Sequence, residues 1–109
     1  VAGGSHESML RAMTHAIQAS KLRWRLYDQE VKPLPFERAF YLATMGGGAF
    51  FGNVGSFLEG YEFDAVVLDD ASLDHPQELS VRARLERAAY LADDRNLTAK
   101  FVAGQKILG

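Results

Sequence analysis

Cysteine is absent from this 109-residue sequence. Its absence excludes disulfide bonds and zinc sites built on thiolates, and it favours a reducing compartment, which we expect to be the cytoplasm. Long apolar runs are also absent, and none approaches the roughly 20 residues that span a bilayer, so we expect no membrane partner. Basic charge is scarce as well: 12 Lys and Arg face 14 Asp and Glu, a net charge of −2. No excess of Lys and Arg is available to neutralise phosphates, which argues against nucleic acid as a partner.

The length and the 48% hydrophobic content indicate one small domain with one core. Apolar residues spaced three and four apart predict three helices. The first is expected to be capped by Ser5 or Ser8 and to end near Tyr27. The second should have Pro35 in its first turn and end at the glycines 46–48, and the third should span Val81 to Ala92.

The β-structure is predicted from turn residues and alternation. Gly55 and Gly60 bracket a tight turn that leads into a buried strand over Ala65–Leu68. The end of the chain is predicted to be a hairpin, with an alternating strand over 97–102 and a short return strand over 106–108. In the loop between the second helix and the first strand, the apolar residues are expected to pack inward; they are Phe50, Phe51, Val54 and Phe57.

Few residues suggest chemistry on their own. The three histidines, His6, His15 and His75, have no spacing typical of a metal site, so we expect no metal bound within the chain. The acid pairs 69–70 and 93–94 are predicted to be solvated rather than a general acid and base, and the turn over 93–96 to be structural.

The glycine clusters 3–4 and 46–48 lack the remainder of any phosphate-binding motif and are interpreted as helix punctuation. Ser5, His6, Glu7 and Ser8 are contiguous, so they do not assemble a catalytic triad, whose members meet from different elements. No catalytic, substrate-binding or metal-binding residue is therefore predicted in this chain.

Several motifs resemble a known family. The turn 54–60 and the run Phe63-Asp64-Ala65-Val66-Val67-Leu68-Asp69 are similar to the C-terminal signature of the amidohydrolase superfamily, although residues 61–63 depart from its usual Lys-x-Ala. Other motifs resemble bacterial, clostridial-type guanine deaminases. They are Val1-Ala2-Gly3-Gly4-Ser5, Ser8-Met9-Leu10-Arg11, Phe40-Tyr41-Leu42-Ala43-Thr44 with Gly46-Gly47, Leu85-Glu86-Arg87, Asp93-Asp94-Arg95-Asn96 and Val102-Ala103-Gly104.

The resemblance implies a fold and a function for a longer protein. The fold class would be α+β: the last helices of a metal-dependent (β/α)8 barrel over 1–52, then the C-terminal part of a small β-sandwich over 53–109, incomplete on its own. The complete enzyme would be a cytosolic homodimeric hydrolase of purine catabolism. It would use one zinc ion to convert guanine to xanthine and ammonia. The segment alone would be inactive and bind no zinc, and it would associate with the N-terminal part of the enzyme.

Carried over residue by residue, the resemblance places the metal ligands before Val1. The residues that would lie beside the metal site, as its supporting shell, are Val1, Ala2, Gly3, Gly4 and Ser5. Two alternatives remain open at this point. One is a free-standing, non-enzymatic α+β interaction module or truncated gene remnant; the other is an amidohydrolase that acts on another aminated or chlorinated ring.

Overall fold

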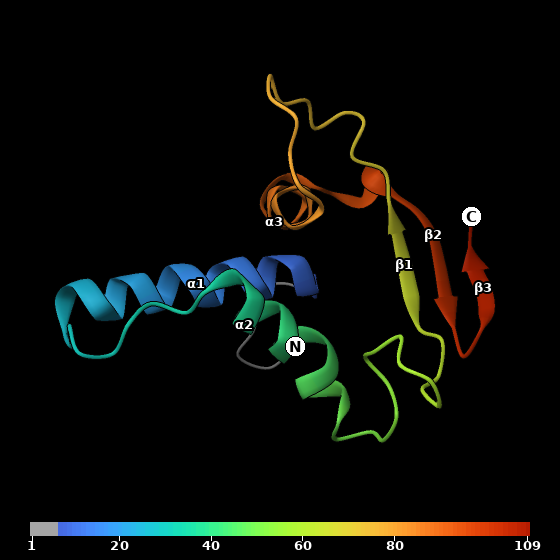
Figure 1. The fold of residues 1–109 in the computed structure, drawn as a ribbon, viewed down its shortest axis with the longest axis horizontal. Helices are drawn as coiled ribbons and strands as arrows, with labels where there is room; N and C mark the ends of the chain where they lie inside the picture. Colours follow the sequence, from blue (N-terminus) through green and yellow to red (C-terminus); the bar gives the residue numbers. More distant parts are fainter. Residues whose placement is uncertain (1–6) are drawn as a thin grey trace.

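The computed structural model describes residues 7–109, which form a small α+β fold (Figure 1). Its helices are α1 (Met9–Leu26), α2 (Phe36–Tyr41) and α3 (Val81–Leu91), and its strands β1 (Ala65–Leu68), β2 (Leu97–Val102) and β3 (Gln105–Leu108). Two short turns of other helix types, η1 (Leu42–Gly46) and η2 (Asp94–Asn96), complete the order α1–α2–η1–β1–α3–η2–β2–β3. The expectations for Val1–Ser5 and His6 lie outside the described residues.

Helix α1 begins where the sequence predicts. The Ser8 hydroxyl accepts a hydrogen bond from the Arg11 backbone N–H at 3.4 Å, which satisfies a free donor of the first turn. Met13 and Ile17 are buried, as their spacing predicts, but Met9 is 58% exposed because no described segment covers the first turn. Within residues 7–109, no helix is long and apolar enough to span a membrane.

Helix α2 begins after Pro35, which lies at the extended N-cap position rather than inside the first turn. The predicted stop at the glycines is confirmed, although the last turn is not α-helical: α2 continues into η1, a π-helical turn that ends at Gly46. The Thr44 hydroxyl donates to the Phe40 carbonyl at 2.7 Å, a side-chain bond that competes with the regular helical ladder. Sequence periodicity alone does not distinguish such a π-turn from an α-helical one.

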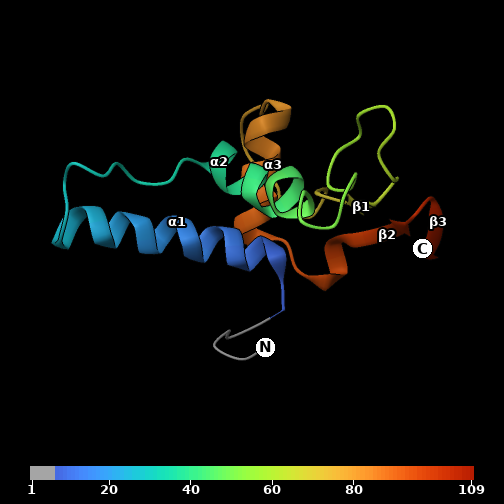
Figure 2. The same cartoon turned by 90° about the horizontal axis from the view of Figure 1, so that it is seen from below.

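Helix α3 packs across α1, and the core lies where the three helices meet (Figure 2). Ser80 caps α3, and Arg82 and Arg84 lie on its exposed side as predicted. The buried core is small and consists of Met13, Ile17, Phe36, Ala39 and Ala89.

The three strands form one antiparallel sheet in the order β1–β2–β3 (Figure 1). The predicted hairpin is confirmed, with β3 beginning one residue earlier than expected. Its two turn residues, Ala103 and Gly104, have φ angles of 49° and 77°, the left-handed pair that a tight hairpin with this twist requires. The pairing register between β1 and β2 shifts between Val67 and Leu68.

Two burial predictions are wrong. Strand β1 is not buried: Val66 is 55% and Val67 47% exposed. The loop aromatics do not pack inward either, since Phe50, Phe51 and Phe57 are 87%, 79% and 77% exposed, while Val54 is half-buried. The physical reason is the same in both cases: an apolar side chain is buried only where a second surface covers it, and residues 7–109 supply none there.

Candidate functional site

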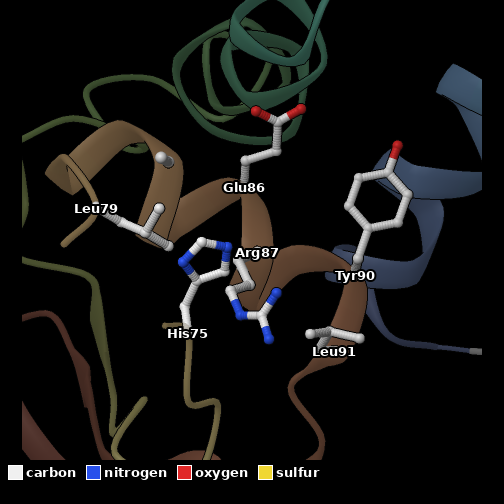
Figure 3. A pocket seen from close by; sticks show the side chains of 7 residues that line it. His75, Leu79, Glu86, Arg87, Tyr90 and Leu91 are labelled. Carbon is white, nitrogen blue, oxygen red and sulfur yellow. The ribbon is translucent and has the colours of Figure 1, made fainter. Parts of the chain in front are cut away.

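A pocket of about 410 Å³ lies between α3 and the loop before it (Figure 3). The loop supplies His75 and Leu79, and the helix supplies Glu86, Arg87 and Tyr90. Figure 3 shows the His75 ring next to the Arg87 guanidinium, with the carboxyl group of Glu86 and the hydroxyl of Tyr90 pointing away from that ring.

Most polar groups of this pocket already have structural partners. His75 Nδ1 lies 3.2 Å from the Gln77 backbone nitrogen, which donates to it. Arg87 donates to the carbonyls of Leu73 and Asp74, at 3.1 and 2.7 Å, and so holds the loop against the helix. Glu86 is paired with Arg82. Most polar groups of the pocket therefore serve to hold the loop and the helix in place and are not free for catalysis.

The acid pair 69–70 is divided in its role. Asp70 accepts two hydrogen bonds from Arg84, at 2.7 and 2.9 Å, and this pairing holds the pKa of the Asp70 carboxyl below its usual value. Asp70 remains in contact with solvent, as predicted, with 31% of its side chain exposed, and its ion-pair partner Arg84 comes from α3, 14 residues further along the chain. Asp69 is exposed, and its carboxylate accepts the backbone N–H of Ala71. A carboxyl that stays ionised is a poor general acid.

The turn over 93–96 is structural, as predicted. Asp93 caps η2, and its hydrogen bonds from Arg95 lower the pKa of its carboxyl. Asn96 is buried, with 7% of its surface exposed. Its amide nitrogen donates to the Asp69 carbonyl at 2.9 Å and to the Ser72 hydroxyl at 3.0 Å, while its oxygen accepts the Asp93 N–H at 3.0 Å. Asn96 therefore joins the end of β1 to the start of β2.

No metal site is formed by the described residues, because residues 7–109 contain no group of three or more His, Cys, Asp or Glu placed to hold an ion. The structure brings His15 and His75 to different elements, α1 and the loop before α3. The predicted supporting shell, Val1 to Ser5, lies outside the described residues, as does the glycine pair 3–4.

Gly48 of the second glycine cluster and Gly55 of the turn that follows have a packing role. A Cβ at Gly48 would collide with the Val54 carbonyl, and a Cβ at Gly55, which has a φ of +85°, would collide with the Thr44 carbonyl. The loop after η1 therefore lies directly against the backbone of η1. This close approach explains these glycines without a phosphate ligand.

An apolar groove of about 670 Å³ separates α2 and η1 from β1. Its walls include Phe40 and Met45 on the helical side, Phe57 in the loop, and Val66 and Leu68 on the strand. The sequence predictions missed this groove and the Asp70–Arg84 pair. Neither has a local signal, since both join segments that are far apart along the chain.

Comparison with known proteins identifies the family to which this chain belongs. A model of the amidohydrolase family matches residues 1–107. Guanine deaminase from Dictyostelium discoideum is 32% identical over 114 residues, which are 98% of this chain and 25% of that protein. Guanine deaminase from Homo sapiens is 32% identical over 119 residues, which are 99% of this chain and 26% of that protein.

Solved structures give the same result. Guanine deaminase from C. acetobutylicum, with guanine bound in its active site, matches with a TM-score of 0.86 and 44% identity over 93% of this chain and 24% of that one. E. coli guanine deaminase matches with a TM-score of 0.75 and 28% identity over 95% of this chain and 24% of that one. The chain thus spans about a quarter of the length of these relatives.

Proposed function

The chain belongs to the amidohydrolase family, and we propose that it is the C-terminal portion of a guanine deaminase-like enzyme. The complete enzyme would add water to guanine and release xanthine and ammonia. The observation that carries the proposal is the match over nearly the whole chain to the C. acetobutylicum enzyme, which holds guanine in its active site.

Within that enzyme, we propose that residues 1–52 belong to the end of a (β/α)8 barrel and residues 53–109 to a β-sandwich. The separation of α1 and α2 from the β-sheet in Figure 2 supports this division. Helix α3 bridges the two parts, because it contributes Ala89 to the helical core and leads through η2 into β2.

The proposed enzyme uses zinc, and the described residues do not fit a metal site. The metal would therefore be held by residues outside 7–109. The role proposed for Val1 to Ser5 is to support that site through their position next to it. When bound, zinc would supply an activated water.

Uncovered apolar surface supports the larger enzyme over a free-standing interaction module. The accessible surface is 8471 Å², whereas a folded monomer of 12.0 kDa exposes about 6,000 Å² by the usual scaling with mass. Leu22, Leu26 and Tyr27, at the projecting end of α1, are 61%, 67% and 86% exposed. These surfaces fit contact with the rest of the polypeptide. We also propose that the complete enzyme is a cytoplasmic homodimer.

The test is an assay of the family-length gene product that contains this sequence. We expect it to contain zinc, measured by elemental analysis, and to release ammonia from guanine with a higher kcat/KM than from other aminated rings. Ammonia release from a different ring, or chloride release from a chlorinated triazine in preference to guanine turnover, would support the other ring-specific amidohydrolase. The 109-residue chain assayed alone should show no turnover. A stable cellular product of about this length would instead favour the free-standing module.

A further inference from the structure

The guanidinium of Arg87, half-buried on α3, carries a charge that no carboxylate of the described residues neutralises. It donates to the backbone carbonyls of Leu73 and Asp74, at 3.1 and 2.7 Å, and both acceptors are neutral. The ion pairs formed within residues 7–109 do not include Arg87. Because a guanidinium has more N–H groups than these two bonds use, Arg87 keeps free donors as well as its full positive charge.

The imidazole of His75 lies beside this guanidinium (Figure 3). Its Nδ1 faces the backbone of Gln77, whose nitrogen is 3.2 Å and whose carbonyl oxygen is 3.1 Å away. Among the described residues, Nε2 of His75 forms no hydrogen bond. Nε2 carries a proton in the neutral ring that accepts the Gln77 N–H, and also in the charged ring that donates to the Gln77 carbonyl. In both forms, His75 offers a second donor next to Arg87.

Apolar side chains complete the walls of the pocket, which has a volume of about 410 Å³. They are Leu79, Ala83 and Leu91. Glu86 also lines the pocket, but its carboxylate is paired with Arg82 and points away from the His75 ring (Figure 3). Pockets of roughly 300–1,000 Å³ with apolar walls and a few polar groups are typical of small-molecule sites. The pocket therefore fits a ligand that has an apolar body and one anionic group.

The charges around the pocket favour a carboxylate over a phosphate. A carboxylate brings one negative charge and two oxygens, which match the single guanidinium charge of Arg87 and the donors of Arg87 and His75. A phosphate ester carries a charge of about −1.5 to −2 at neutral pH, so part of its charge would stay unpaired. Glu86, which lines the same pocket, would repel that excess.

We propose that this pocket binds a small organic carboxylate, with Arg87 and His75 on the carboxylate and the three apolar side chains against the body of the ligand. The inference goes beyond the proposed function, because it does not depend on which ring the complete enzyme deaminates. Arg87 belongs to α3 and His75 to the loop before it, so a bound carboxylate joins the loop to the helix and stabilises their contact.

Three aromatic probes test the site by calorimetric titration of the family-length gene product at low salt. Phenylacetate has the carboxylate and the apolar body, 2-phenylethanol has the same body without charge, and phenyl phosphate has a larger charge. We expect phenylacetate to bind at least about tenfold more tightly than 2-phenylethanol, because hydrogen bonds to a charged group are the stronger ones. It should also bind more tightly than phenyl phosphate. No binding of phenylacetate, equal binding of the alcohol, or tighter binding of the phosphate would overturn the proposal.

Two substitutions check that phenylacetate binds in this pocket. Ala83→Leu fills the pocket with a good helix former and removes no polar contact, so we expect it to weaken binding at least about tenfold. His75→Asn keeps an acceptor for the Gln77 N–H but removes the Nε2 donor, and it should weaken binding about fivefold.

Ala19→Leu is the matched control, because Ala19 is an exposed alanine of α1 that does not line the pocket, and it should bind phenylacetate normally. Unchanged binding in both Ala83→Leu and His75→Asn would place the ligand elsewhere and overturn the assignment. If Ala83→Leu fails to fold, His75→Asn decides. Guanine turnover of the unmodified protein is measured separately, so a failed pocket with intact turnover overturns the pocket assignment alone.

Discussion

Replacing Asn96 by Ala is expected to be among the most destabilising polar substitutions in this chain. The side chain is buried and makes three hydrogen bonds, to the Asp93 N–H, the Asp69 carbonyl and the Ser72 hydroxyl. At a net value of about 1 kcal/mol each, their loss should lower the free energy of unfolding by about 3 kcal/mol. The substitution also leaves the Asp69 carbonyl and the Asp93 N–H without these partners, so the loss should not be recovered by local rearrangement.

Urea unfolding followed by far-ultraviolet circular dichroism measures this loss. Ser72→Ala removes only one of the three bonds and should cost at most about 1 kcal/mol. Asn53→Ala is the matched control, because Asn53 is an exposed asparagine in a loop and should change stability by no more than about 0.5 kcal/mol. If Asn96→Ala were no more destabilising than Asn53→Ala, the role of Asn96 as the link between β1 and β2 would be refuted.

Three further substitutions probe charge, backbone and surface. Arg84 lowers the pKa of Asp70 in the fold, so the unmodified chain should be more stable than Asp70→Asn above the ordinary pKa of 3.8, and this difference should disappear as the pH falls below it. Unfolding curves from pH 7 to 2 measure the difference, and a difference independent of pH would refute the reasoning. Gly55→Ala should cost about 2 kcal/mol or more in urea unfolding, from its positive φ and the collision with a carbonyl, whereas Gly52→Ala, with a φ of +113° and nothing nearby, should pay only the conformational cost. The isolated chain should self-associate in light scattering, and Phe57→Ser should reduce this; a monodisperse unmodified monomer would contradict it.

Local signals in the sequence predicted the local elements. Ser8, one of the two caps predicted for the first helix, marks the start of α1, and its side chain accepts the expected backbone hydrogen bond. The alternation over 97–102 and the turn residues after it predicted the hairpin, and the observed loop of two residues, Ala103 and Gly104, leaves few alternative pairings. These features depend on residues that are neighbours along the chain, which is why the sequence alone specifies them.

The candidate site was less predictable because it depends on distant residues. Arg84 reaches Asp70 from another element, and the groove forms only when η1, the loop around Phe57 and β1 come together. The π-turn over Leu42–Gly46 has the same spacing of apolar residues as an α-helical turn at this length. The loop also packs against this turn, where Gly55 approaches the Thr44 carbonyl.

The errors in predicted burial have a common physical origin. A compact chain of 109 residues has a radius of gyration of about 13 Å, whereas this chain has 15.5 Å. Its apolar content is that of a folded domain, yet Phe50, Phe57 and Val66 lie outside the core. Composition predicts how much apolar surface must be covered, but not whether the covering surface belongs to the same segment. The exposed loop aromatics and the open edge of β1 are therefore consistent with one explanation, a sequence whose burial pattern is completed by further polypeptide.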